Sequence, residues 1–297
     1  MGLKFIESKN LILEDKKDNL YFENRLDTNS HWIETRTGIK SRFFSHIDTE
    51  EMTINLSKLF KSEMKDLDLI ICASFSTKRK MPSLSSIARE TLGGNEKCLC
   101  IDVNLACSGF SGALILAEKY LEEGRRGFVF ACEKISDYMD MDDRSTAILF
   151  GDGAAGVLVE KNNKLFISDT RSLNHENTLN LYEGEKITMA GKKVYRFAVE
   201  EVPNSIKRLM DEINIKGDKI DKIILHQANY RIINSVLKNL NIDEEKSLSN
   251  LDYYGNTSAA TIPIVIADNY EKLEDGDLLI MSGFGAGLAV VSILMEC

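Results

Sequence analysis

The sequence lacks any uninterrupted apolar run of the roughly eighteen residues that a membrane-spanning helix needs. Its first residues also lack the basic-then-apolar pattern of a secretory signal. Ile6 stands where an N-myristoylation signal requires Ser or Thr. These absences predict a cytoplasmic protein that is not held at a membrane.

Positive charge and metal-binding patterns are also scarce. Lys and Arg number 37 against 46 Asp and Glu, and the net charge of −9 argues against nucleic acid as a general partner. The cysteines show no metal-type pairing with the histidines, so reduced structural thiols are the default expectation and no metal site is predicted. The six cysteines lie at positions 72, 98, 100, 107, 132 and 297.

The chain does contain 297 residues with 43% hydrophobic content, which is enough for a large core. Apolar runs that predict strands alternate with helical periodicity, and this alternation favours an α/β layered fold with parallel strands. Strands are expected at 67–75, 99–105, 127–132, 157–160, 165–168, 220–225, 278–281 and 288–294. Helices are expected at 50–65, 83–92, 109–124, 193–214, 230–240 and 256–270.

Four segments are harder to interpret. Residues 1–30 indicate one or two strands interrupted at 8–10, and residues 31–42 indicate a loop. The predicted helix 256–270 carries Pro263 inside it, which is costly unless a neighbouring segment accommodates a kink. The glycine-rich segment 151–156 lacks the full spacing of a dinucleotide-binding loop, so that interpretation is discounted.

Three segments of the first part recur in the second part. Residues 66–76 resemble 219–229, the strand, turn and helix around Cys107 resemble 247–268, and 150–160 resemble 283–296. Such a repeat indicates a duplicated architecture. It predicts two halves, 1–160 and 161–297, with the turn at Asn256 opposite the turn at Cys107.

Cys107 is expected where a buried strand ends and a helix begins. The unpaired N–H groups and the dipole of a helix start favour a thiolate, which is the nucleophilic form of cysteine. Free cysteines are also among the most buried residue types, and most of them only pack. These residues alone therefore leave catalysis and packing equally open.

His226 is the only one of the four histidines that follows a buried apolar run, at a strand end where α/β sheets place ligand-binding groups. A structural histidine is the alternative, and Asn256 could be a plain helix cap. Together with Cys107 they offer a nucleophile, an imidazole and an amide donor. Glycines at 283–287 can present backbone N–H groups, so the amides of Cys107 and Ala286 are the candidate oxyanion hole.

Five motifs resemble the β-ketoacyl-acyl carrier protein synthase III family of the thiolase fold. They are WIETRTGI at 32–39, ACSGF at 106–110, FGDGA at 150–154, HQANYRII at 226–233 and GNTSAA at 255–260. The resemblance implies an αβαβα architecture and a homodimer. It also implies that Cys107, His226 and Asn256 form the catalytic triad.

The resemblance further implies a ping-pong reaction without metal or redox cofactor. Cys107 takes the acyl group from an acyl-coenzyme A thioester, which is a substrate. Malonyl-acyl carrier protein is then decarboxylated, and the resulting enolate attacks the acyl-cysteine. In this scheme a mostly neutral His226 donates from Nε2 to the enolate oxygen, and Asn256 donates beside it.

Further binding residues are implied by the same resemblance. Coenzyme A would contact Thr28, Trp32, Arg36, Arg144 and Asn229, with the Trp32 ring and Arg144 on either side of its adenine. An acidic carrier protein would dock on Arg196, Arg231 and Lys238, and Met81 and Phe284 would shape the acyl pocket.

The chain departs from the family at Met81, where an aromatic residue is frequent, and in its first 27 residues. These departures leave the acyl donor and the pathway open. One alternative is a relative that passes the acyl group to a nucleophile other than malonyl-acyl carrier protein. A Cys-His-Asn hydrolase and a non-catalytic carrier-binding partner are the alternatives of other classes.

Overall fold

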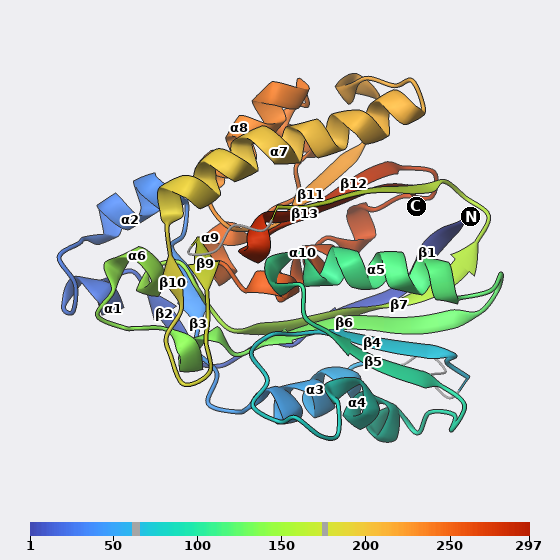
Figure 1. Ribbon diagram of the computed structural model, residues 1–297, viewed down its shortest axis with the longest axis horizontal. Helices are drawn as coiled ribbons and strands as arrows, with labels where there is room; N and C mark the ends of the chain where they lie inside the picture. The colour runs from blue at the N-terminus through green and yellow to red at the C-terminus, as the bar shows by residue number, and fades with distance from the viewer. Residues whose placement is uncertain (61–65, 174–177) are drawn as a thin grey trace.

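The computed structural model describes residues 1–60, 66–173 and 178–297, and its core is two β-sheets (Figure 1). The first sheet has the order β1-β7-β6-β4-β5, in which β4 runs parallel to both β5 and β6, whereas β7 and β1 are antiparallel to their neighbours. Its strands are β1 (Gly2–Asn10), β4 (Leu69–Ala73), β5 (Leu99–Val103), β6 (Arg126–Glu133) and β7 (Gly153–Asn162).

The second sheet repeats this succession of directions. In its order β11-β12-β13-β8 the first pair of strands is parallel and the next two pairs are antiparallel. A single parallel bridge joins Ile223 of β11 to Ser247, and it takes the position that the pairing of β5 with β4 has in the first sheet. Its strands are β8 (Phe166–Ser172), β11 (Lys222–Leu225), β12 (Leu278–Gly285) and β13 (Ala289–Glu296). Both sheets are therefore mixed rather than wholly parallel. In the second sheet, the turn η7 (Ala286–Leu288) joins β12 to β13 and is so short that these two strands can pair only antiparallel.

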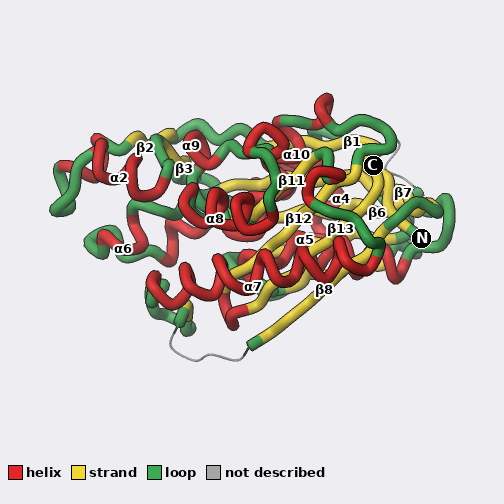
Figure 2. The backbone as a smooth tube through the Cα atoms, turned by 90° about the horizontal axis from the view of Figure 1, so that it is seen from above, coloured by secondary structure: helices red, strands yellow, loops and turns green. Residues whose placement is uncertain are grey.

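Helices form three layers, one between the two sheets and one outside each of them (Figure 1), and the view from above shows the two helices outside the second sheet side by side (Figure 2). The helices α5 (Gly109–Tyr120) and α10 (Thr261–Asp268) lie between the sheets. Outside the first sheet lie α3 (Thr49–Ser57) and α4 (Leu84–Leu92), and outside the second lie α7 (Gly191–Glu212) and α8 (Tyr230–Leu240). This arrangement confirms the thiolase-like αβαβα architecture with its duplicated halves. The domain boundary at 160/161 stays a prediction.

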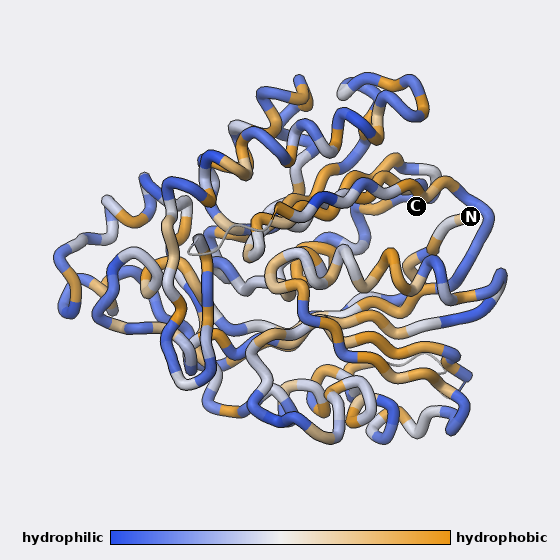
Figure 3. The backbone as a smooth tube through the Cα atoms, in the orientation of Figure 1, coloured by the Kyte–Doolittle hydropathy of each residue, from blue (hydrophilic) through white to orange (hydrophobic). Residues whose placement is uncertain are grey.

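Hydrophobic residues concentrate on β4, β6, β7 and α5, as Figure 3 shows, because these elements are covered on both sides. Smaller elements gather at the end of the molecule where α2 and α6 lie (Figure 1). They are β2 (Lys16–Asp18), α1 (Leu20–Glu23), α2 (Ser30–Thr37), β3 (Ser41–Phe43), α6 (Arg144–Ala147), β9 (Leu179–Asn180), β10 (Thr188–Met189) and α9 (Leu251–Tyr254).

Several local predictions are wrong. The strand β1 continues through residues 8–10 because it pairs with β7 along its length. Residues 31–37 are helical, since Asn29 accepts a hydrogen bond from the Trp32 N–H and Gly38 ends the helix with φ of 81°. By contrast, the discounting of a dinucleotide-binding loop at 151–156 agrees with the structure, because this segment runs into the strand β7, where Phe128 and Phe130 fill the space that a side chain at Gly156 would need.

Three further differences concern helix ends and burial. Pro263 lies in the first turn of α10, where its missing N–H breaks no helical hydrogen bond, so no kink is needed. The helix predicted over 50–65 ends at Ser57, and its last five positions lie outside the described residues. The strand β5 forms the sheet edge, so Leu99 is 38% exposed and the strand is not buried.

Candidate active site

Two equivalent turns start the central helices α5 and α10. The 3-10 turn η1 (Ala106–Ser108) precedes α5, and η5 (Ser258–Ala260) precedes α10; each begins with a left-handed residue, Ala106 at φ 45° and Ser258 at φ 51°. Asn104 Oδ1 accepts from the Ala106 N–H at 3.2 Å, and Asn256 Oδ1 accepts from the Ser258 N–H at 2.9 Å. The duplication therefore brings the turn of Asn256 opposite the turn of Cys107, as the repeat predicts.

Cys107 lies in the first turn and is 6% exposed. The Ser258 hydroxyl lies 3.5 Å from its sulfur, with Sγ as acceptor. Burial raises the pKa of the Cys107 thiol to about 11, although the Ser258 hydrogen bond acts in the opposite direction. Cys107 therefore rests as a thiol, and the expectation that the helix start favours a thiolate is wrong here because desolvation outweighs it.

His226 follows β11 and is 1% exposed. Burial lowers the pKa of His226 to about 3, so the imidazole is neutral near pH 7. Its Nδ1 lies 2.8 Å from Thr261 Oγ1, and the ring stands edge-on to Phe284 at a centroid distance of 5.1 Å. Both contacts restrict the orientation of the ring, which lines a cavity together with Phe284.

Asn256 is 5% exposed and shares that cavity wall with Cys107 and His226. Asn256 Oδ1 accepts a hydrogen bond from the Ser258 N–H. This bond identifies the other end of the amide, Nδ2, as the hydrogen-bond donor. The structure thus brings the three predicted catalytic residues together on one wall.

The cavity on this wall has a volume of about 360 Å³ and extends away from Cys107 toward α2 and α6. Four of the five predicted coenzyme A residues line it, namely Trp32, Arg36, Arg144 and Asn229. The guanidinium groups of Arg144 and Arg36 lie 5.0 Å and 6.0 Å from the Trp32 ring centroid. Such a group of cations around an aromatic ring suits a planar ligand that carries phosphates.

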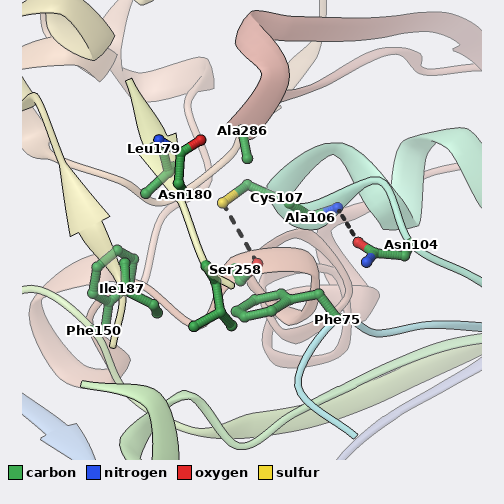
Figure 4. A pocket seen from close by; sticks show the side chains of 11 residues that line it. Phe75, Asn104, Ala106, Cys107, Phe150, Leu179, Asn180, Ile187, Ser258 and Ala286 are labelled. Carbon is green, nitrogen blue, oxygen red and sulfur yellow. Dashed lines mark hydrogen bonds between the residues drawn. The ribbon is translucent and has the colours of Figure 1, made fainter. Parts of the chain in front are cut away.

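A second cavity, of about 210 Å³, begins on the other side of Cys107 (Figure 4). Its walls are mainly apolar and include Phe75, Phe150 and Ile187. Ser258 and Ala286 lie at its end next to the sulfur, and Figure 4 shows the Ser258 hydrogen bond to Cys107. Cys107 therefore stands between a tunnel lined with cations and an apolar pocket.

Gly285 makes this position of the nucleophile possible. A Cβ added at Gly285 would lie 2.8 Å from Cys107 Cβ and 3.0 Å from Sγ, closer than packed atoms come. The GFGAG segment ends β12 and begins the turn η7 that leads to β13, so it is a tight strand connection that also passes beside Cys107. Ala286, the predicted second oxyanion amide, lines the pocket beside Cys107.

The remaining predicted residues lie elsewhere. Thr28 and Met81 line neither cavity, and Met81 is 85% exposed. Arg196 on α7 and Arg231 and Lys238 on α8 are exposed on neighbouring outer helices. Phe284 lines the larger cavity beside His226, not the apolar pocket.

Three contact residues were missed by the sequence interpretation. Ser258 contacts Cys107, and Thr261 contacts His226. The spacing of three residues between Ser258 and Thr261, at a predicted helix start, is the only sequence signal that could have indicated them. Glu133 is fully buried at the end of β6, where its Oε2 accepts from the Ser76 hydroxyl and N–H. Burial raises the pKa of Glu133 to about 8, and its charge contributes to the raised pKa of Cys107.

All six cysteines are free. No helix among the described residues is both long and apolar enough to cross a membrane. Within residues 1–60, 66–173 and 178–297, no group of three or more His, Cys, Asp or Glu side chains is arranged to hold a metal ion.

Comparison with known proteins gives consistent results. The family 3-oxoacyl-[acyl-carrier-protein] synthase III matches residues 101–172, and its C-terminal part matches residues 210–297. The chain is 37% identical to the β-ketoacyl-[acyl-carrier-protein] synthase III of Acholeplasma laidlawii, over 97% of this chain and 96% of that protein. It is 34% identical to the enzyme of that name from Geobacillus kaustophilus, over 100% and 99%.

Solved structures agree with these sequence matches. The 3-oxoacyl-[acyl-carrier-protein] synthase III of Aquifex aeolicus superimposes with a TM-score of 0.93 at 31% identity, covering 100% of both chains. The priming β-ketosynthase of the R1128 polyketide pathway gives a TM-score of 0.91 at 26% identity, covering 99% and 96%. Fold and site thus define a condensing acyltransferase of the thiolase fold. Within that class, the chain belongs to the β-ketoacyl-[acyl-carrier-protein] synthase III family.

Proposed function

We propose that the protein transfers an acyl group from acyl-coenzyme A to Cys107 and condenses it with malonyl-acyl carrier protein to give a 3-oxoacyl-acyl carrier protein. The observation that carries this proposal is the position of Cys107 between two cavities. The tunnel of about 360 Å³ suits the long, phosphate-bearing carrier of a thioester, and the apolar pocket of about 210 Å³ suits its acyl chain.

The first half-reaction forms the acyl-cysteine. The adenine of coenzyme A lies between Trp32 and Arg144. Arg36 holds the phosphates, and the pantetheine arm leads to the sulfur of Cys107. Because Cys107 rests as a thiol, it loses its proton as it attacks, and the departing coenzyme A thiolate takes up a proton, so the exchange is neutral overall. The backbone N–H groups of Cys107 and Ala286 stabilise the tetrahedral oxyanion, and coenzyme A leaves.

The second half-reaction forms the carbon–carbon bond. Malonyl-acyl carrier protein enters the emptied tunnel and loses carbon dioxide, and the enolate oxygen accepts hydrogen bonds from Asn256 Nδ2 and His226 Nε2. The enolate carbon attacks the acyl group, and the Cys107 sulfur leaves. The side chains of this site and the two N–H groups perform these steps, so we propose that neither metal nor redox cofactor takes part.

The carrier protein docks, in this proposal, on exposed basic residues of α7 and α8. Arg231 lies near the tunnel because its guanidinium donates to the Thr35 carbonyl of α2 at 3.5 Å. Arg196 and Lys238 add positive charge on the same two helices. An acidic carrier would be attracted to this surface and would deliver its pantetheine arm to the tunnel.

We further propose a homodimer built on the free edge of β5. That edge leaves backbone hydrogen-bonding groups open to another strand, and large apolar side chains surround it. Leu99, Leu105, Leu116 and Tyr120 are 38%, 43%, 43% and 50% exposed on β5, the segment after it, and α5. A second copy that paired along β5 would cover these side chains, and the exposed Met81 would then be available for contact with the partner.

Light scattering should give twice the chain mass for the wild type. It should give the mass of a monomer for the double variant Leu99→Lys with Leu116→Lys.

The alternatives of other classes gain no support. A Cys-His-Asn hydrolase would need a different fold, and a non-catalytic partner would not need three catalytic side chains on one cavity wall. An acceptor other than malonyl-acyl carrier protein stays compatible with the site. The cytoplasmic location stays a prediction.

The test is a condensation assay with purified protein, a panel of acyl-coenzyme A donors and malonyl-acyl carrier protein. Mass spectrometry should detect a 3-oxoacyl-acyl carrier protein with at least one donor and none with Cys107→Ala. Acyl transfer to Cys107 without condensation would reject malonyl-acyl carrier protein as the acceptor.

A further inference from the structure

Arg42 is a buried cation to which the reaction described above gives no role. It lies in the middle of β3, is fully buried, and lines neither cavity beside Cys107. Burial lowers the pKa of Arg42 to about 9, although the charge of Asp18 acts in the opposite direction, so the guanidinium is charged near pH 7. Burying a charge costs free energy unless hydrogen bonds compensate for it. The acceptors of this guanidinium therefore indicate what it stabilises.

These acceptors connect the ends of two helices that line the tunnel. Arg42 Nη2 donates to the carbonyl oxygen of Ile148, which ends α6. Arg42 Nη1 donates to Asn19 Oδ1 at 2.8 Å. Asn19 Nδ2 in turn donates to the carbonyl oxygen of Ile39 at 2.8 Å, two residues after α2 ends at Thr37. One guanidinium thus links the end of α2 to the end of α6.

The same guanidinium packs on an aromatic ring between these helices. Its central carbon lies 4.5 Å from the ring centroid of Phe22, which adds a cation–π interaction. Phe22 belongs to a hydrophobic cluster with Ile33 of α2 and Ala147 of α6, and Trp32 packs against that cluster. Polar and apolar contacts of Arg42 therefore act on the same pair of helices.

These two helices carry the cations and the aromatic ring of the tunnel. Trp32 and Arg36 lie on α2, and Arg144 lies on α6. The guanidinium groups of Arg144 and Arg36 both lie near the Trp32 ring, at 5.0 Å and 6.0 Å from its centroid. Like charges repel, so the two arginines favour separation of the helices unless another contact holds them together.

We propose that Arg42 is a positioning residue for the coenzyme A tunnel, because it holds Arg144 of α6 beside Trp32 of α2 before the donor binds. This inference rests on the proposed function and deepens it by naming a residue outside the tunnel on which donor binding depends. Arg42 acts through the two helices and not on the thioester. It therefore contributes to binding of the adenine and phosphates rather than to the chemistry at Cys107.

Titration calorimetry with coenzyme A alone tests this role. Arg42→Met removes both hydrogen bonds and should raise the Kd for coenzyme A by about tenfold or more, the effect of losing one hydrogen bond between a charged group and a phosphate. Arg42→Lys keeps the charge but not the two nitrogens in one plane, so it should also bind coenzyme A more weakly than the wild type. A wild-type Kd in either variant would overturn the proposal.

A comparison of two donors separates positioning from a general loss of structure. An acyl-N-acetylcysteamine has the same thioester as acyl-coenzyme A but lacks the adenine and the phosphates. In Arg42→Met, the KM for acyl-coenzyme A should rise, whereas kcat/KM for acyl transfer from the acyl-N-acetylcysteamine to Cys107 should match the wild type. Equal losses with both donors would overturn the proposal.

Lys161→Met is the matched control, because it also removes a buried cation. Lys161 Nζ lies 2.6 Å from Glu118 Oε1, at the opposite end of α5 from Cys107. This variant should have a lowered melting temperature and a wild-type Kd for coenzyme A. Weaker binding by Lys161→Met, equal to that of Arg42→Met, would show that any loss of stability impairs the tunnel and would overturn the proposal.

Asn19→Ala tests the same connection if neither Arg42 variant folds. It removes the link to Ile39 but keeps the cation, and it should also raise the Kd for coenzyme A. A wild-type Kd in a folded Asn19→Ala protein would overturn the link to α2. Failure of the proposed function would be recognised separately, because the wild-type protein itself would then not bind coenzyme A, and the inference would be rejected with it.

Discussion

Replacing Gly285 by alanine should move the nucleophile without removing any catalytic group. The added Cβ would lie 2.8 Å from Cys107 Cβ and 3.0 Å from its Sγ. Gly285 has an extended φ of 167°, so the expected effect comes from this contact rather than from backbone strain. Because α5 and β12 are both packed in the core, the methyl group can be accommodated only by shifting Cys107.

The size of the effect can be estimated from similar changes. Overpacking of a core by one methyl group costs about 1–3 kcal/mol of stability. A displacement of about 1 Å in a catalytic group reduces the rate roughly 100-fold. We therefore expect Gly285→Ala to fold with a lowered melting temperature and to acylate Cys107 about two orders of magnitude more slowly.

Gly287→Ala is the matched control in the same turn. Gly287 has a φ of 73°, so alanine there costs about 1–2 kcal/mol of backbone strain. Open space surrounds its Cβ position, however, and nothing would displace Cys107. If the two variants lose similar stability but only Gly285→Ala loses acylation, the contact with Cys107 is the cause. Wild-type acylation by a folded Gly285→Ala protein would refute the reasoning.

Three other substitutions test separate parts of the site. Asn256→Ala should leave acylation of Cys107 measurable by mass spectrometry but reduce condensation about 100-fold or more, because one enolate donor is lost; equal losses in both half-reactions would contradict this role. Ser258→Ala removes a hydrogen bond that lowers the pKa of Cys107, so the pH profile of its alkylation by iodoacetamide should shift to higher pH. Burial raises the pKa of Glu133 from its ordinary value of 4.5 to about 8, so the folded protein binds the carboxyl proton more tightly than the unfolded chain does. The stability that this proton binding contributes to the folded state is therefore fully present below pH 4.5 and is lost as the pH rises through 8. Glu133→Gln should therefore gain stability relative to the wild type between pH 5 and pH 8, measured as urea midpoints, and a constant difference would show that Glu133 does not titrate in that range.

Local patterns predicted the elements that depend on their own residues. The helix α8 begins and ends where its periodicity predicts, and α4 lies within the predicted range 83–92. The repeat predicted the facing turns because both halves carry the same strand, turn and helix. The resemblance predicted which residues share the tunnel wall, with Trp32 and Arg144 in contact.

Properties that depend on distant neighbours could not be predicted. The strand β1 is continuous only because β7 pairs with it from about 150 residues further along the chain, and β5 is exposed because no strand among the described residues pairs with its outer edge. The raised pKa of Cys107 follows from burial under both sheets, which a helix-start argument does not include. Thr261 meets His226 across a sequence separation of 35 residues, and its spacing from Ser258 at a helix start does not indicate which residue it contacts.

Every step of the proposed reaction passes through an acyl group on Cys107. Intact-protein mass spectrometry after incubation with a panel of acyl-coenzyme A thioesters can detect that group. We expect a mass increase of one acyl group for the wild type, mapped by peptide analysis to Cys107 and absent from Cys107→Ala. An acyl group on another residue, or no adduct with any short, medium or branched donor, would contradict it.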